Sequence, residues 1–265
     1  MCKEIKCVIW DLDNTVWDGI LTEDKEVRLR EEVKNAIIEL DGRGILNSIS
    51  SKNNYDDAMK KLDEFGLSQY FLYGEINWNP KSSSVEKIMK NLNISYDTLL
   101  LVDDSDFERN EVQSVHPDVM VDDGTDIEAL LAHERLNPKF ITVDAKMRRQ
   151  MYLASIERKN SEDNFVGTNE EFLRSINMRF TIREASKEDL IRVQELTIRT
   201  HQLNSTGITY SFDELDEFRK SKDHKLLVCE LEDKFGSYGK IGIALVEIGS
   251  EWHLKLLLMS CRVMN

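Results

Sequence analysis

The chain has 265 residues, of which 41% are hydrophobic and 32% are charged, and its formal net charge is −14. Such a composition is typical of a folded chain with room for one large domain or two modest ones. The negative charge argues against a nucleic-acid partner, because phosphate backbones bind to basic faces. No apolar run approaches the ~20 residues that cross a bilayer, and the four cysteines match neither a zinc spacing nor a disulfide framework. We therefore expect a cytoplasmic protein with no membrane partner.

Predicted strands and helices alternate from the N-terminus to residue 121. The apolar, β-branched run Ile5–Trp10 ends at an acidic turn, which predicts a buried strand. A hairpin follows over Thr15–Leu29, and further strands are predicted over Gly44–Ser50, Tyr70–Gly74, Thr98–Val102 and Val119–Val121. Helical spacing is found over residues 28–41, 55–65, 81–92 and 107–115. The alternation predicts an α/β fold with a Rossmann-like parallel sheet and helices on both faces.

The pattern changes after residue 124. Helices with charged faces are predicted over residues 126–135, 143–158 and 169–176. A second α/β pattern opens at Met178, with a helix over 187–200 and strands over Met178–Arg183, Leu226–Leu231, Lys240–Glu247 and Trp252–Met259. We therefore expect a catalytic domain over residues 1–140, a helical connector over 141–177 and a second, partial α/β domain over 178–265.

Polar clusters follow three strands of the predicted parallel sheet, at Asp11–Thr15, Ser50–Asn53 and Asp103–Asp106. Ligands of open α/β sheets bind at the carboxyl ends of the strands. The three clusters therefore predict one functional site at that edge.

The pair Asp11 and Asp13 has a spacing that suits phosphoryl transfer. A tight turn can place both carboxylates in one cleft, and different environments can give them different roles. Asp11 would be a nucleophile or metal ligand, and Asp13 a general acid and base whose carbonyl could also bind the metal. Thr15 would hold the turn beside the phosphate. The alternative interpretation of Asp-Asn-Thr is a helix N-cap or an Asx turn.

Asp103 and Asp104 add carboxylates at a neighbouring strand end. Their hard oxygen atoms suit Mg²⁺, which commonly keeps waters and a substrate phosphate. The alternative role is capping of the next helix, for which one Asp would be enough. We favour Asp103 as the metal ligand because it comes first after its strand.

Residues for a phosphate group are predicted after two other strands. Ser51, Lys52 and Asn53 offer a hydroxyl and the amides of a helix start. Lys81, which follows Asn79-Pro80, could neutralise developing charge or steady the nucleophile. Each of these is a weak signal alone, and their order along the chain carries the argument.

In that order the motifs resemble those of the haloacid-dehalogenase (HAD) superfamily. The residues concerned are Asp11-Leu12-Asp13-Asn14-Thr15, Ser51, Lys81 and Asp103-Asp104. The strings "INWNPKSSS" and "LLLVDDSDFERNEV" resemble more narrowly the FkbH-like branch, HAD subfamily IIIC, as do "ELTIRTHQLNSTG" and "DKFGSYGKIG" in the second domain. The likeness covers nearly the whole chain.

This resemblance implies a Mg²⁺-dependent enzyme that takes the glyceryl group of 1,3-bisphosphoglycerate, a phosphorylated three-carbon acid, and releases phosphate. The glycerate is then loaded on the phosphopantetheine thiol of an acyl carrier protein, for polyketide extender units. For the second domain, the resemblance implies an acyltransferase fold of the GNAT type.

One departure from the family pattern concerns the acyl group. Members that load glycerate carry Cys before the serine of the second motif, where this chain has Ser50. A hydroxyl nucleophile needs a dedicated base, whereas a thiol is partly ionised near neutral pH. Ser50 could form an oxyester with a base such as His201, a candidate site residue of the second domain. Alternatively, acyl loading is lost, or the chain is an engineered variant with Cys replaced by Ser.

A second departure is the end of the chain, which stops before the Gly-rich loop on which GNAT domains bind coenzyme A pyrophosphate. We expect a truncated domain or an interaction surface there. No insertion after Asp13 or Lys81 is long enough for a cap domain, so we expect an open cleft. Docking an acidic carrier protein would need a basic patch, and the densest candidates are Lys146, Arg148, Arg149, Arg158 and Lys159. The alternative interpretation is that these residues form a solvated helix face.

Three hypotheses follow. The first is glyceryl loading of an acyl carrier protein, and the second is a plain Mg²⁺-dependent phosphatase of a small phosphorylated metabolite that attacks through Asp11. The third is a non-catalytic scaffold for carrier docking. The set Asp11, Asp13, Ser51, Lys81 and Asp103 favours the first two, because binding alone does not require it.

Overall fold

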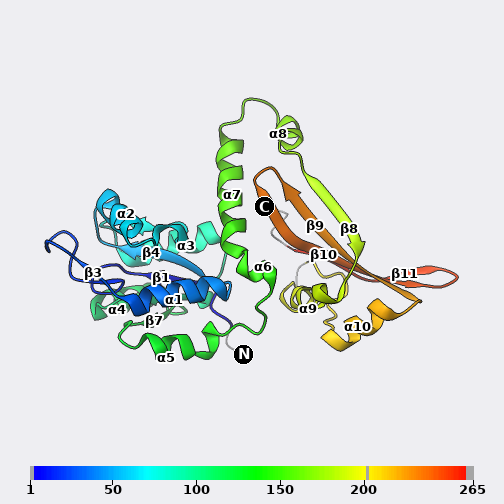
Figure 1. Ribbon diagram of the computed structural model, residues 1–265, viewed down its shortest axis with the longest axis horizontal. Helices are drawn as coiled ribbons and strands as arrows, with labels where there is room; N and C mark the ends of the chain where they lie inside the picture. The colour runs from blue at the N-terminus through cyan, green and yellow to red at the C-terminus, as the bar shows by residue number, and fades with distance from the viewer. Residues whose placement is uncertain (1–2, 201–202, 261–265) are drawn as a thin grey trace. The chain divides into compact units, whose positions relative to one another are not determined.

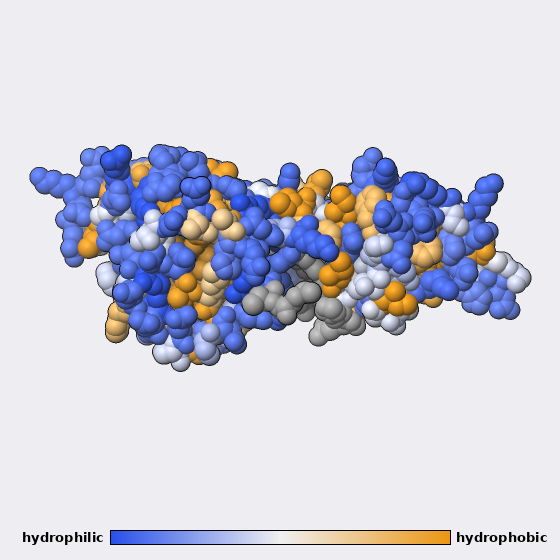
Figure 2. Space-filling model, turned by 90° about the horizontal axis from the view of Figure 1, so that it is seen from below, coloured by the Kyte–Doolittle hydropathy of each residue, from blue (hydrophilic) through white to orange (hydrophobic). Residues whose placement is uncertain are grey.

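The computed structural model describes residues 3–200 and 203–260, and the chain divides into two compact units, 1–141 and 142–265 (Figure 1). Within the described ranges, no helix combines the length and the apolar character needed to cross a membrane. Figure 2 shows a face dominated by hydrophilic side chains, with hydrophobic ones in small scattered groups.

The first unit is built on a five-stranded sheet in the order β5-β4-β1-β6-β7, and every pairing in it is parallel. Its strands are β1 (Cys7–Trp10), β4 (Leu46–Ser51), β5 (Glu75–Ile76), β6 (Leu99–Val102) and β7 (Met120–Asp122). Its helices are α1 (Glu31–Gly42), α2 (Tyr55–Glu64), α3 (Lys81–Leu92), α4 (Asp106–Val115) and α5 (Ile127–Ala132), with 3-10 turns at Ser68–Tyr70, Tyr96–Thr98 and Glu134–Leu136. The predicted Rossmann-like sheet with flanking helices is confirmed.

Alternate residues of the central strands face opposite sides of this sheet, as the period of two in a strand requires. Val8 and Trp10 of β1 join Leu100 and Val102 of β6 in one core cluster, which also contains buried residues of α1, α2 and α5. The residues between them, such as Ile9, are equally buried on the other face, where α3 and α4 pack against each other. Both faces of the central strands are therefore covered by helices.

Two local predictions in this unit need correction. The predicted strand Tyr70–Gly74 is wrong, because Tyr73 has a left-handed φ of 52° that interrupts an extended run. Phe71 makes only an isolated bridge there, and β5 begins at Glu75 instead. The predicted hairpin is present as β2 (Trp17–Asp18) paired with β3 (Arg28–Leu29), so α1 starts at Glu31 rather than at residue 28.

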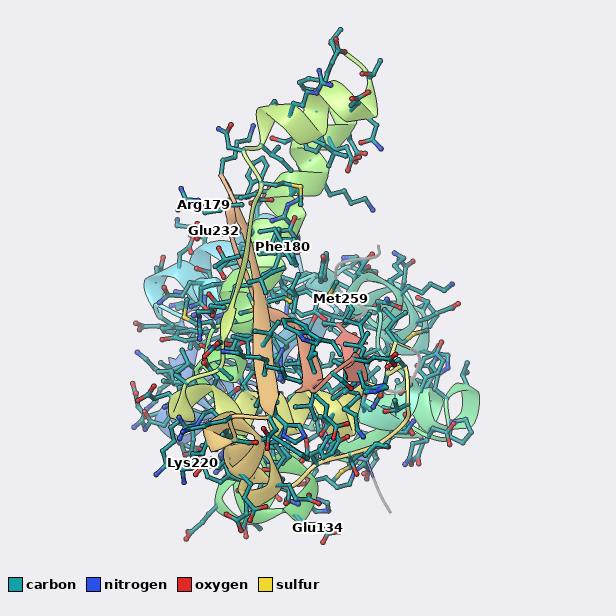
Figure 3. The ribbon with its side chains drawn as sticks, turned by 90° about the vertical axis from the view of Figure 1, so that its right-hand side faces the viewer. Glu134, Arg179, Phe180, Lys220, Glu232 and Met259 are labelled. Atoms are coloured by element: carbon teal, nitrogen blue, oxygen red, sulfur yellow. The ribbon has the colours of Figure 1, made fainter. Side chains whose placement is uncertain are left out.

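The second unit contains an antiparallel four-stranded sheet in the order β11-β10-β9-β8. Its strands are β8 (Arg179–Glu184), β9 (His224–Asp233), β10 (Gly236–Ile248) and β11 (Trp252–Met259), close to the predicted ranges. Figure 3 shows Arg179 of β8 beside Glu232 of β9, and an ion pair of 3.3 Å joins them. One face of the sheet packs on helices in a cluster of buried aliphatic side chains.

The helices of the second unit differ from the prediction in two places. They are α6 (Val143–Lys146), α7 (Arg148–Asp163), α8 (Asn169–Ser175), α9 (Leu190–Arg199) and α10 (Phe212–Lys220), with a 3-10 turn at Lys187–Asp189. The helix predicted over 143–158 is divided at Met147, and α10 was not predicted. Its capping box, Ser211 with Glu214, was the sequence signal that marks this helix start.

Candidate active site

The strand register brings two acidic turns together. Trp10 of β1 pairs with Val102 of β6, so the next residues, Asp11 and Asp103, leave the sheet side by side. The backbone N–H of Asp11 donates to the carbonyl of Val102 over 2.9 Å, and that of Asp103 donates to the carbonyl of Asp122 over 3.1 Å. Both carboxylates are therefore held at the carboxyl edge of the sheet by backbone bonds.

Lys81, the first residue of α3, joins this pair. Its Nζ lies 2.7 Å from Oδ1 of Asp11, hydrogen-bonds to Oδ2 of Asp103, and lies 2.6 Å from Oε2 of Glu108. The cluster is largely buried, because Asp11, Asp103 and Lys81 are 6%, 0% and 3% exposed, while the Glu108 side chain is 16% exposed. Lys52 reaches Glu108 from outside, with 2.7 Å between Nζ and Oε1. Three carboxylates thus share the buried ammonium of Lys81, and Glu108 also pairs with the partly exposed ammonium of Lys52.

Burial and crowding determine how these groups titrate. Burial raises the pKa of Asp11 to about 7; Lys81 opposes this rise, while the charges of Asp103 and Glu108 add to it. Burial also raises the pKa of Asp103, again against the effect of Lys81. Burial alone would lower the pKa of Lys81, but the attraction of the three carboxylates outweighs it and raises the pKa. The pKa of Glu108 lies below its usual value, because Lys81 and Lys52 together outweigh its burial.

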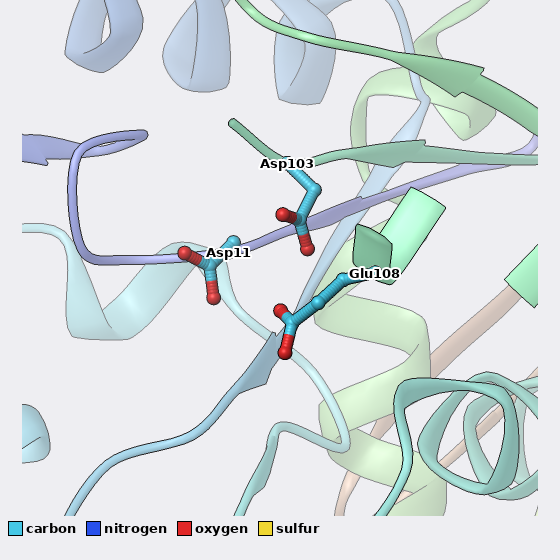
Figure 4. Close-up of side chains that lie close together, drawn as sticks. All are labelled: Asp11, Asp103 and Glu108. Atoms are coloured by element: carbon cyan, nitrogen blue, oxygen red, sulfur yellow. The ribbon is translucent and has the colours of Figure 1, made fainter. Parts of the chain in front are cut away.

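The acidic side chains of this cluster form a candidate metal site. Asp11, Asp103 and Glu108 each offer a carboxylate oxygen, and these atoms lie within 4.8 Å of one another (Figure 4). Such oxygen-only donors fit Mg²⁺. Glu108 was missed by the sequence analysis, although it lies in the first turn of α4, directly after the predicted Asp103–Asp106 cluster.

The other two predicted metal ligands have different surroundings. Asp104 is exposed, and its backbone N–H donates to Oγ1 of Thr15 over 3.2 Å, which ties the two acidic turns together. Asp13 is half-buried and accepts hydrogen bonds from Trp17 Nε1 at 2.8 Å and Asn53 Nδ2 at 2.9 Å. Neither carboxylate belongs to the group of three, and their metal-binding roles stay predictions.

The second predicted motif ends β4. Ser51 and Asn53 are buried, and Asn53 Nδ2 lies 3.3 Å from Ser51 Oγ. Ser50 is 1% exposed, and within the described part of the chain its hydroxyl has no hydrogen-bond partner. No described base therefore contacts Ser50, and His201, the base that the sequence suggested, lies outside the described residues.

Part of this chain is similar to known proteins. Residues 17–114 match the family of haloacid dehalogenase-like hydrolases. No curated protein matches the chain. Among solved structures, one similar chain is the N-terminal part of a Bacteroides fragilis protein containing a phosphatase domain complexed with Mg, at 28% identity and a TM-score of 0.46. The match covers 51% of this chain and 40% of that one, so this chain spans less than half of the other's length.

Two further similar structures have lower identity. A HAD-superfamily hydrolase from Ehrlichia chaffeensis is 14% identical with a TM-score of 0.41, over 49% of this chain and 97% of that chain. The cobalt-bound deoxy-D-mannose-octulosonate 8-phosphate phosphatase from Haemophilus influenzae is 16% identical with a TM-score of 0.36, over 64% of this chain and 97% of that chain. The narrower likeness to the FkbH-like branch, and the GNAT-type fold of the second unit, stay predictions.

Proposed function

We propose that the HAD-like hydrolase domain of the first unit is a Mg²⁺-dependent phosphatase that attacks a small phosphorylated metabolite through Asp11. The observation that carries this proposal is the buried contact of Asp11 with Lys81, beside Asp103 and Glu108. Burying two carboxylates and an ammonium, with a third carboxylate partly buried beside them, is costly. A scaffold that only docks partners has no use for such a cluster, whereas phosphoryl transfer needs both a nucleophile and cations.

The acidic group is the proposed metal site. Asp11, Asp103 and Glu108 would hold Mg²⁺ through carboxylate oxygens, because hard oxygen donors at this spacing are what the ion prefers. A bound Mg²⁺ supplies positive charge against the phosphate oxygens. Lys81, which contacts the same three carboxylates, contributes a second positive charge beside this site and holds the Asp11 carboxylate in the cluster.

The proposed reaction has two steps. In the first, a carboxylate oxygen of Asp11 bonds to phosphorus while the bond from phosphorus to the leaving-group oxygen breaks, and Asp13 gives its proton to that oxygen. In the second, the Asp13 carboxylate takes a proton from water as the water oxygen bonds to phosphorus. The bond between phosphorus and Asp11 then breaks, which frees inorganic phosphate and restores both carboxyl groups to their starting states.

A finer proposal is the loading of glycerate from 1,3-bisphosphoglycerate on an acyl carrier protein, as the FkbH-like resemblance implies. The Ser50 hydroxyl favours it, because it is buried and has no hydrogen-bond partner among the described residues. A catalytic role is one explanation for such a group. Two of the basic residues expected to dock a carrier are already engaged, because Arg158 lies 2.6 Å from Asp233 and Arg148 lies 3.8 Å from Glu195.

Phosphate release from p-nitrophenyl phosphate with Mg²⁺ tests the main proposal. Asp11→Asn should abolish turnover, whereas Asp18→Asn, an exposed carboxylate of the nearby hairpin, should keep it. Undiminished turnover in Asp11→Asn would refute attack through this residue. Intact-mass spectrometry after incubation with 1,3-bisphosphoglycerate tests the finer proposal, using the protein and its Ser50→Cys variant. A glyceryl adduct that moves to a carrier thiol supports loading, and phosphate release without any adduct excludes it.

A further inference from the structure

The carboxylate of Asp13 is fixed from two sides. Trp17 Nε1 donates to its Oδ1 over 2.8 Å, and the backbone N–H of Leu21 donates to the same oxygen over 3.1 Å. Asn53 Nδ2 donates to Oδ2 over 2.9 Å. Trp17 and Leu21 lie in or beside the β2–β3 hairpin, whereas Asn53 follows β4, so two separate segments determine how the carboxylate is turned.

Counting acceptor positions shows which oxygen of Asp13 can take part in a reaction. A carboxylate offers about four acceptor positions, two on each oxygen. From the described residues, Oδ1 receives two donors and Oδ2 receives one. The position that stays open to a substrate is therefore on Oδ2, the oxygen that Asn53 contacts.

The donors are themselves held in place. Trp17 is fully buried, its ring lies 6.1 Å from that of Phe65, and its backbone pairs with Leu29. Asn53 is buried, and its amide also contacts Ser51. Side chains packed in this way keep one rotamer, which preserves the geometry that proton transfer requires.

We infer that Trp17 and Asn53 are positioning residues that turn Oδ2 of Asp13 toward the leaving-group oxygen. The inference rests on the proposed phosphatase function and assigns neither residue a contact with the reacting atoms. Protonation matters most when the leaving group is a basic alkoxide. An acidic phenolate departs without a proton. Loss of either donor should therefore slow alkyl phosphates far more than aryl phosphates.

Trp17→Phe tests this directly, because it removes the indole N–H and keeps an aromatic ring. The matched control is Trp10→Phe, since Trp10 is equally buried and its indole N–H donates to Asn47 over 2.9 Å in the core. The measurement is kcat/KM with Mg²⁺ for an alkyl phosphate and for p-nitrophenyl phosphate. The value of kcat/KM reports the steps up to cleavage of the leaving-group bond and does not include the later attack of water.

For Trp17→Phe we expect kcat/KM to fall about 100-fold with the alkyl phosphate and less than about threefold with the aryl phosphate. Trp10→Phe should leave the ratio of the two substrates unchanged. Asn53→Ser should reproduce the selective loss, and it decides the question if Trp17→Phe does not fold. Equal losses on both substrates, or none, would overturn the inference. Absence of phosphate release by the unaltered protein would instead refute the proposed function.

Discussion

The amine of Lys81 lies 2.7 Å from Oδ1 of Asp11, although 70 positions separate the two residues in the sequence. The same amine contacts Asp103 and Glu108, so it is the internal counter-charge of a buried acidic cluster. One ammonium does not balance three carboxylates, and Lys52 reaches only the outer one of them. This deficit of positive charge gives the cluster its expected affinity for a divalent cation.

Replacement of this amine should make the fold depend on Mg²⁺. Lys81→Met leaves the buried carboxylates of Asp11 and Asp103 without this counter-charge, whereas Glu108 keeps its pair with Lys52. The change should cost about 3–5 kcal/mol of unfolding free energy in metal-free buffer. Saturating Mg²⁺ should raise the unfolding free energy of Lys81→Met by more than it raises that of the unaltered protein. Urea denaturation with and without Mg²⁺ measures this. Lys87→Met, an exposed position on the same helix, is the control. Equal stabilisation of all three proteins by Mg²⁺ would contradict the prediction.

Metal affinity should depend on pH through Asp11. Its pKa of about 7 in the folded protein exceeds the value of about 4 in an unfolded chain. The folded state therefore binds the extra proton, and the stability of the metal-free protein should fall as pH rises from about 4 to 7. Because the ion needs the ionised carboxylate, Mg²⁺ affinity should rise over the same range.

Calorimetric titration with Mg²⁺ at about pH 6 and about pH 8 measures this second effect. Binding should be weaker at the lower pH and should release protons there. Asp11→Asn should reduce the pH dependence of stability of the metal-free protein between about pH 4 and 7, and Asp103 should account for part of what stays. An affinity for Mg²⁺ that is the same at both pH values would show that protonation of Asp11 does not compete with the ion.

Removal of the charge on Glu108 should weaken metal binding without unfolding the domain. Glu108→Gln keeps the side-chain length but removes the charge of a proposed ligand. We expect Mg²⁺ affinity to fall by at least about 10-fold, since loss of a residue that only contacts a ligand already costs about 10- to 100-fold. The control is Asp106→Asn on the same helix, where the carboxylate is exposed. Titration calorimetry compares the two variants. If both bind Mg²⁺ as tightly as the unaltered protein, Glu108 is not a ligand.

In the second unit, an ion pair between Arg183 and Asp189 should make stability depend on acid pH. The guanidinium of Arg183 donates two hydrogen bonds to Asp189, from NH1 to Oδ2 over 2.6 Å and from NH2 to Oδ1 over 3.0 Å. Burial raises the pKa of Asp189, but the bonds from Arg183 and Ser186 outweigh burial and hold that pKa well below its usual value. Because the folded pKa is depressed, this stabilisation is present above about pH 4 and is lost as pH falls through the folded pKa.

Asp189→Asn should therefore cost about 2 kcal/mol at neutral pH, and the difference from the unaltered protein should shrink in acid. The control, Glu188→Gln, changes an exposed neighbour and should be neutral. Urea titrations over a series of pH values measure both variants. A loss that stays constant down to acid pH would show that the ion pair is not its cause.

Much of the first unit could be predicted from the sequence because its signals are local. The apolar runs at Ile5–Trp10 and Thr98–Val102 correspond to β1 and β6, and the rule that parallel strands present their carboxyl ends at one edge placed Asp11 near Asp103. The strand predicted at Tyr70–Gly74 failed because the left-handed backbone of Tyr73 is not visible in composition.

The sequence alone determined the parallel sheet and the acidic residues at the ends of its strands. It also identified Asp11, Lys81 and Asp103 as candidate site residues. These features could be predicted because periodicity and turn chemistry act between neighbours in the chain. Only the tertiary structure decided that Lys81 shares its charge with Glu108, and that Trp17 holds Asp13. Those contacts depend on how helices and a hairpin pack on the sheet. Electrostatic and hydrogen-bond energies change over a few ångströms, a scale that residue order does not specify.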